Sequence, residues 1–363
     1  ASEMCIRYIK YTSQTETYSV LDIDGNVTKA GYTIPLTNEE IQESYYTMLL
    51  SRRFDEKMLK WQRQGKMLTF PPNLGEEGLQ VATAISMHKD DWFAPAFRSA
   101  AVFLHKKVPM WKIMLVWKGN ELGNKMPEEL NFLPFNVPIG TQYSHAAGIG
   151  MALNYENKPN VAYTFIGDGG TAEGEFYEAM NIASIRNAQT VFCVNNNQWA
   201  ISTPTAKETG QLDIASKAIA AGLDFIKVDG NCLFASVEAA RAAREYVLQN
   251  KKPILIEFVT YRMGPHTTSD NPRVYRTEEY EKEQEKKDPI IRLEKWMMRN
   301  GLLDEAKKAA LEEKISNEIE EAYKTMESNT TVTVSDIFDY TYKTLDESLL
   351  EQKAEAMKVN GGK

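Results

Sequence analysis

Short apolar runs alternate along the middle of the chain with segments whose apolar residues recur at helical spacing. Four runs have the length and β-branched content of buried strands: VAYTFIG (161–167), TVFCVNN (190–196), DFIKVDG (224–230) and PILIEFVTY (253–261). The segments with helical spacing lie between them, at 171–187, 213–222 and 233–249. Strand–helix–strand alternation with apolar runs is typical of a parallel sheet covered on both faces. We therefore predict a three-layer α/β fold, with helical appendages at both ends.

The segment before this region predicts a small appendage followed by a long helix. Residues 18–34 alternate between apolar and polar positions around Asp24-Gly25-Asn26, which is a hairpin signal. Thr37, with Glu40 three residues later, fits a capping box at the start of a helix. Gly65 is a plausible end of that helix.

The proportion of charged residues rises after the last predicted strand. Residues 278–327 are heavily charged and helical in pattern, which is typical of helices that expose one face to solvent. These changes predict three regions: an N-terminal hairpin and helical extension at 1–65, a central α/β domain at 66–277, and a helical C-terminal region at 278–363.

Composition narrows the class of protein. The 363 residues carry 42 Lys and Arg against 50 Asp and Glu, a net charge of −8 that argues against a nucleic-acid partner. No apolar run approaches the roughly 18–20 residues that span a bilayer, and the polar opening 1–18 lacks the apolar core of a signal peptide. Cys5, Cys193 and Cys232 are too few and too scattered for a disulfide framework or a cysteine metal site. We expect a globular cytoplasmic protein with no membrane partner.

Polar residues follow two neighbouring strands of the predicted sheet. One strand ends in Gly167-Asp168-Gly169-Gly170, and the next along the chain ends in Asn195-Asn196-Asn197. Because the strands of a right-handed βαβ unit run parallel, their carboxyl ends meet at the same crevice. Carboxylate and amide oxygens suit Mg²⁺, and the glycines allow backbone N–H groups to approach a phosphate. The pattern predicts a magnesium–diphosphate site.

Two other interpretations fit part of the pattern. Gly167, Gly169 and Ala172 also match the dinucleotide fingerprint G-x-G-x-x-A of a nicotinamide-dependent oxidoreductase. That site needs an acidic residue at the end of the second strand to hold a ribose, where this chain has asparagines. A glycine-rich turn with a capping Asp168 would explain the first half of the motif alone.

The GDG motif followed by NN at 196–197 resembles the thiamin diphosphate signature. The likeness covers about residues 40–345 and identifies the chain as similar to the alpha subunits of the first component of pyruvate dehydrogenase, a thiamin diphosphate-dependent 2-oxo acid dehydrogenase family. It is carried by these segments: FRS (97–99), VPIGTQYSHAAG (137–148), GDGGTAEGEFYEAMN (167–181), NNNQWAISTPT (195–205), VDGN (228–231) and YRMGPHTTSDNPRVYR (261–276).

The resemblance implies a role for particular residues. The Mg²⁺ ligands are expected to be Asp168, Asn197 and the main-chain carbonyl of Trp199. Other cofactor contacts are expected from Phe97 and Arg98, from the apolar wedge Ile139 with the backbone at Val137, and from Gly167, Gly169 and Gly170. His266 is the expected catalytic residue beside the reaction centre, and Phe70 is a candidate for the substrate wall.

The resemblance also implies an activity and partners. The expected reaction is oxidative decarboxylation of pyruvate, with transfer of the acetyl group to lipoyl groups of a dihydrolipoyl acetyltransferase core. Only one cofactor-type βαβ unit is recognisable, so the carboxylate that activates thiamin diphosphate is expected on a separate beta subunit, in an α2β2 heterotetramer. The alternatives are a branched-chain 2-oxo acid or acetoin dehydrogenase alpha subunit, an NAD-dependent Rossmann oxidoreductase, and a scaffold without catalytic activity.

Overall fold

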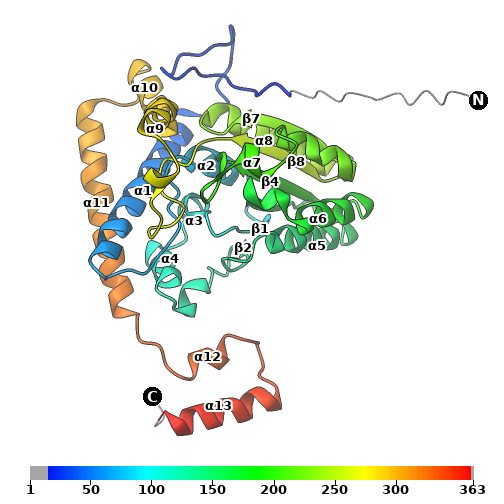
Figure 1. Cartoon of the computed structure of the whole chain (residues 1–363), viewed down its shortest axis with the longest axis vertical. Coiled ribbons are helices and arrows are strands. Elements are labelled where there is room, and N and C mark those ends of the chain that lie inside the picture. The colour runs from blue at the N-terminus through cyan, green and yellow to red at the C-terminus, as the bar shows by residue number, and fades with distance from the viewer. Residues whose placement is uncertain (1–14, 361–363) are drawn as a thin grey trace, which may run out of the picture.

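The computed structural model describes residues 15–360 and contains a central parallel sheet of six strands in the order β2-β1-β3-β4-β8-β7 (Figure 1). Four of these strands coincide with the predicted apolar runs: β3 (Ala162–Gly167), β4 (Thr190–Asn196), β7 (Asp224–Asp229) and β8 (Ile254–Val259). The sequence did not predict the two short strands at the other edge, β1 (Trp92–Ala94) and β2 (Asn131–Phe132).

Helices cover both faces of the sheet, as predicted. One face carries α5 (Thr141–Tyr155), α6 (Gly174–Ile185) and the 3₁₀ helix η3 (Ile214–Ala221), and the other carries α2 (Glu77–Ser86) and α8 (Leu233–Asn250). Successive side chains of a strand point to opposite faces. On β4, Val191 and Cys193 accordingly join the core under α2 and α8, whereas Phe192 and Val194 join the core under α5 and α6. The three-layer α/β prediction is confirmed.

The chain before the sheet contributes an edge strip and a long helix. Tyr18 forms a parallel bridge with Val228 of β7, and a turn at 22–26 is closed by a single antiparallel bridge rather than by two paired strands. Helix α1 (Asn38–Arg63) begins with the predicted capping box, in which the Thr37 side chain accepts from the backbone of Glu40. Helix α3 (Ala100–His105) packs on α1 and α2.

The remaining elements surround this core. Helix α11 (Glu305–Ser328) packs along α1 and α4 (Met110–Trp117), after α9 (Glu278–Glu285) and α10 (Pro289–Arg299). Helices α12 (Asp336–Asp339) and α13 (Glu347–Val359) lie apart from the body in Figure 1. Small connecting elements complete the fold: η1 (Glu121–Asn124), η2 (Gly169–Ala172), β5 (Trp199–Ala200), β6 (Thr203–Pro204), α7 (Thr205–Glu208) and η4 (Pro272–Val274). Between residues 15 and 360, no helix is long and apolar enough to cross a membrane.

Candidate functional site

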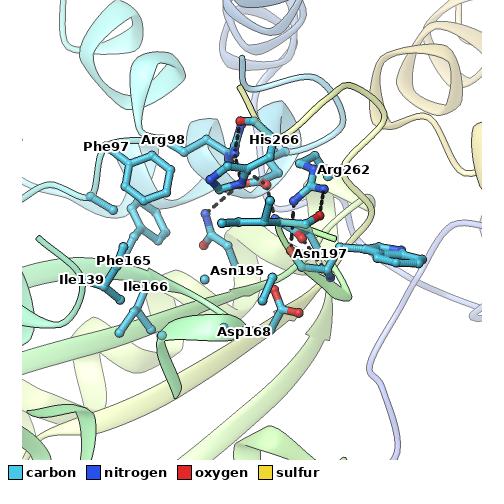
Figure 2. A pocket seen from close by; sticks show the side chains of 18 of the residues that line it. Phe97, Arg98, Ile139, Phe165, Ile166, Asp168, Asn195, Asn197, Arg262 and His266 are labelled. Carbon is cyan, nitrogen blue, oxygen red and sulfur yellow. Dashed lines mark hydrogen bonds and ion pairs between the residues drawn. The ribbon is translucent and has the colours of Figure 1, made fainter. Parts of the chain in front are cut away.

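A cavity of about 290 Å³ lies at the carboxyl ends of β3 and β4. Figure 2 shows an apolar side, which carries Phe97, Ile139, Phe165 and Ile166, and a polar side opposite it. The polar side chains come from distant parts of the chain: Glu76, Arg98, Asp168, Asn195, Asn197, Arg262 and His266. The cavity can therefore hold a molecule with an apolar ring at one end and a charged group at the other.

The glycine motif shapes one wall of this cavity. Gly167 pairs with Asn195 across β3 and β4, and the turn η2 follows it directly. A Cβ added at Gly169 would lie 2.7 Å from Ala200 Cβ, and one at Gly170 would lie 2.4 Å from Ile166 Cγ1. A Cβ at Gly167 would meet no atom within 4 Å, although this residue lines the cavity. Glycine is required at 169 and 170 for packing, and at 167 it leaves bare backbone open to a ligand.

The predicted metal ligands line this cavity together. Asp168 is 1% exposed, and its Oδ2 accepts a hydrogen bond of 2.7 Å from the Thr205 hydroxyl. Burial raises the pKa of the Asp168 carboxyl to about 6, although the Thr205 hydrogen bond and the charge of Arg262 act to lower it. Asn197 Oδ1 accepts from Trp199 N at 3.2 Å, and the Trp199 carbonyl accepts from Arg262 Nη1 at 2.9 Å. Among the described residues no group of three His, Cys, Asp or Glu side chains is placed to hold a metal, so any ion here rests on this mixed set of oxygens.

Arg98 is held in the cavity by main-chain carbonyls. Its Nη2 donates to the His266 carbonyl at 2.8 Å, and its Nη1 donates to the Pro72 carbonyl. The guanidinium also lies 5.6 Å from the centre of the Phe97 ring. Burial lowers the pKa of Arg98 to about 10, which leaves it charged at neutral pH. The cavity thus presents a fixed positive charge beside its polar side.

His266 lies between Arg98 and the aromatic wall. Its backbone N–H donates to Asp270 Oδ2 at 2.8 Å, and its ring meets the Phe97 ring edge-on, with centroids 5.9 Å apart. Burial and the positive charges of Arg98 and Arg262 lower the pKa of His266 to about 4. The imidazole is therefore neutral at pH 7 and can act as an acceptor or a donor.

Comparison with known proteins identifies the family. The model of the dehydrogenase E1 component family matches residues 45–335. A pyruvate dehydrogenase E1 component subunit alpha from Mycoplasma pneumoniae is 49% identical over 350 residues, which cover 96% of this chain and 98% of that protein. Proteins of the same name from Acholeplasma laidlawii and Staphylococcus aureus are 40% and 36% identical, over 94% of this chain and 99% and 92% of theirs.

The chain belongs to the dehydrogenase E1 component family. This family is thiamin diphosphate-dependent, which favours the thiamin interpretation of the glycine motif over the nicotinamide alternative. The cavity has the two parts that such a cofactor requires, since an apolar wall lies opposite bare glycine backbone and a buried arginine.

Two residues named from the family likeness do not line the cavity. Phe70 is buried, its carbonyl accepts from the backbone of Thr268 at 3.0 Å, and it is not among the residues that line the cavity. Val137 is 61% exposed and lies beyond the lining residues, whereas Ile139 two positions later does line the cavity.

Several lining residues were not predicted as site residues, among them Arg262, Gln142 and Glu76. Arg262 is buried and donates to the carbonyls of Trp199 and Ile201, which fixes the segment after β4. Gln142 donates from Nε2 to the Phe165 carbonyl at 2.8 Å. Glu76 lies just before α2 and binds the asparagines at the end of β4. Arg262 follows directly after a predicted strand, which was a usable signal, but the sequence around Glu76 carries no recognisable motif.

Proposed function

We propose that this chain is the alpha subunit of a pyruvate dehydrogenase E1 component that binds thiamin diphosphate and Mg²⁺. In the proposed reaction, pyruvate is oxidatively decarboxylated and its acetyl group passes to lipoyl groups of a dihydrolipoyl acetyltransferase core. The near full-length similarity to three proteins of that name carries the proposal. The cavity at the carboxyl ends of β3 and β4 supports it independently.

The donor set fits a magnesium-bound diphosphate. Asp168, the Asn197 amide oxygen and the Trp199 carbonyl would supply hard oxygen ligands, and Mg²⁺ commonly completes its shell with water and phosphate. Arg98 would pair with the diphosphate, and the backbone at Gly167 and Gly169 would approach it closely. The apolar side would hold the rings, with Ile139 as the wedge between them.

The chain's own residues orient the substrate and manage a proton. When bound, thiamin diphosphate supplies the carbanion chemistry that releases CO₂ from a 2-oxo acid. His266 presents a neutral imidazole at the mouth of the polar side, where it can exchange a proton with the reacting group. Its position is set by the backbone bond to Asp270 and by the Phe97 ring. We therefore assign His266 as the catalytic residue of this subunit.

A beta subunit is expected to complete the site. Three acidic residues line the cavity in the described part of the chain: Glu76, Asp168 and Glu173. Glu76 is occupied by hydrogen bonds, Asp168 belongs to the metal set, and Glu173 lies on an exposed turn. This supports an α2β2 assembly in which the beta subunit supplies the activating carboxylate.

The metal assignment is tested by Asp168→Ala. We expect thiamin diphosphate binding to lose its Mg²⁺ dependence and to weaken at least about 100-fold, because the only carboxylate of the ligand set is removed. Asp90→Ala removes an exposed carboxylate outside the cavity and serves as the matched control. Unchanged cofactor affinity in Asp168→Ala would remove the metal assignment.

The shared site and the substrate are tested by reconstitution with the beta subunit. The isolated chain is expected to decarboxylate pyruvate negligibly until that subunit is added, and robust turnover by the chain alone would contradict a shared site. In the reconstituted enzyme, pyruvate is expected to give a higher kcat/KM than branched-chain 2-oxo acids. The opposite order would indicate a branched-chain 2-oxo acid dehydrogenase, and preference for acetoin would indicate an acetoin dehydrogenase.

A further inference from the structure

Glu76 is a buried carboxylate on which donors from two distant segments converge, the end of β4 and Arg98. It is 1% exposed and lies at the start of α2. Asn197 Nδ2 donates to its Oε1 at 2.7 Å, and Asn195 Nδ2 donates to its Oε2 at 3.1 Å. Arg98 Nε lies 3.6 Å from Oε1. A buried carboxylate so arranged is a fixed acceptor at the back of the cofactor cavity.

An ionised carboxylate only accepts hydrogen bonds, whereas an asparagine amide both donates and accepts. Both asparagines must therefore turn their nitrogen atoms toward Glu76 and their oxygen atoms away from it. Within residues 15–360, Asn197 Oδ1 accepts only a 3.2 Å bond from Trp199 N. Asn195 is 4% exposed, and its Oδ1 is buried without any hydrogen-bond partner among the described residues. The amide oxygens of Asn195 and Asn197 therefore have a fixed orientation in the cavity lining, and each can still accept a further hydrogen bond.

We propose that Glu76 is a positioning residue that fixes the orientation of these two amides for the cation. The inference rests on the proposed function and adds to it. Glu76 holds Asn197 so that its oxygen is presented as a ligand of Mg²⁺. It holds Asn195 so that its unpartnered oxygen accepts from a water of the same ion. Neither Glu76 nor Asn195 contacts the ion itself in this arrangement.

The contacts show that Glu76 does more than neutralise Arg98. The two amide bonds, at 2.7 and 3.1 Å, are shorter than the 3.6 Å separation from the guanidinium. Arg98 is already held by the carbonyls of Pro72 and His266. The shortest contacts of Glu76 are therefore those that orient the asparagines.

The isosteric change Glu76→Gln tests the proposal, because a glutamine offers one acceptor and one donor. Its carbonyl is expected at the Oε1 position, next to Arg98 and Asn197, which places its NH₂ against Asn195. Asn195 must then turn and present a donor to the cavity. We expect a 10- to 100-fold loss of Mn²⁺ affinity, the typical effect of losing a residue that orients metal ligands. Affinity is read from the EPR signal of free Mn²⁺ in the full-length chain assembled with its beta subunit at saturating thiamin diphosphate.

A second substitution distinguishes loss of the amide orientation of Asn195 from general disruption of the site. Aspartate has oxygen on both branches and needs no fixed orientation, so Glu76→Gln combined with Asn195→Asp should recover most of the lost affinity. Glu178→Gln removes the same charge from the exposed face of α6 and should bind Mn²⁺ like the unmodified chain. Thermal melting of every variant checks that folding is retained.

The outcomes distinguish failure of the positioning role from failure of the proposed metal site. Unchanged Mn²⁺ affinity in Glu76→Gln overturns the positioning role, and so does a loss that neither Asn195→Asp nor Asn197→Asp recovers. Asp168→Ala is measured alongside. If that variant also keeps full Mn²⁺ affinity, the metal site of the proposed function is wrong. If Asp168→Ala loses affinity while Glu76→Gln does not, only the role of Glu76 fails.

Discussion

Gly167→Ala should separate cofactor binding from folding. The added Cβ would meet no protein atom within 4 Å, and the residue lies outside the set of positive-φ positions in the described chain. Alanine is therefore compatible with both the space and the backbone at this position. The methyl group would instead cover bare backbone at the edge of the cavity that we assign to the diphosphate. The chain should therefore fold normally with alanine at position 167, but it should bind thiamin diphosphate more weakly.

The size of the effect follows from the contacts that the methyl group would prevent. A hydrogen bond to a charged group contributes about 1.5–3 kcal/mol. Loss of one such bond between backbone N–H and diphosphate corresponds to a roughly 10- to 150-fold weaker Kd, at about 1.4 kcal/mol per factor of ten. We expect the free energy of unfolding without cofactor to change by less than about 1 kcal/mol, because no core contact is altered.

The assay is a titration of the chain, assembled with its beta subunit, with thiamin diphosphate at fixed Mg²⁺. Trp199 lines the cavity, so its fluorescence provides the signal. The matched control is Gly123→Ala, whose Cβ would lie 2.4 Å from the Lys112 carbonyl oxygen and 2.6 Å from Val116 N. That variant should lose about 1–3 kcal/mol of stability while its folded fraction binds cofactor normally.

The reasoning is refuted if Gly167→Ala is folded and binds thiamin diphosphate like the unmodified chain. It is also refuted if the two glycine variants lose stability equally, because Gly167 would then be required for folding and not for cofactor binding.

Three further predictions concern the buried ionisable side chains of Arg98, His105 and Arg52. Arg98→Lys should weaken thiamin diphosphate binding about tenfold by calorimetry, since lysine keeps the charge but loses the planar fork. Burial lowers the pKa of His105 to about 4, so the unfolded chain binds a proton more readily between about pH 4 and 6.5. Native stability should therefore rise with pH across that window by at most about 3 kcal/mol, and urea unfolding at pH 5 and 7 should show a smaller rise in His105→Asn. Arg52→Met should cost about 3–5 kcal/mol in urea unfolding, because it leaves the buried carboxylates of Glu77 and Asp288 without their cation.

The centre of the fold was predictable because the sequence there is locally consistent. The strands β3, β4, β7 and β8 each contain a short apolar run, whereas the intervening segments repeat their apolar residues at helical spacing. Parallel pairing then places Asp168 and the asparagines at one edge, which requires only the handedness of the crossover. That is why residues 29 positions apart, Asp168 and Asn197, could be assigned to one site before any coordinates were known.

Other parts of the structure have no such local signal. The strands β1 and β2 contain three and two residues, too few for any period to be recognised. The bonds from Glu76 to Asn195 and Asn197 span 119 and 121 positions, so only the packing of α2 against the end of the sheet reveals them. The absence of Phe70 from the cavity lining likewise depends on tertiary packing, in which its backbone pairs with that of Thr268, 198 positions away.

The polar and apolar sides of the cavity differ in how fully contacts within this chain order their side chains. On the polar side, Glu76 orients two amides and main-chain carbonyls hold Arg98, so these groups are ordered by contacts within the subunit. Binding a diphosphate there requires little further ordering, which favours affinity. On the apolar side, Ile139 stays 45% exposed at the edge. Diphosphate binding should therefore depend mainly on alpha-subunit residues. Ring placement and catalysis should depend on the beta subunit.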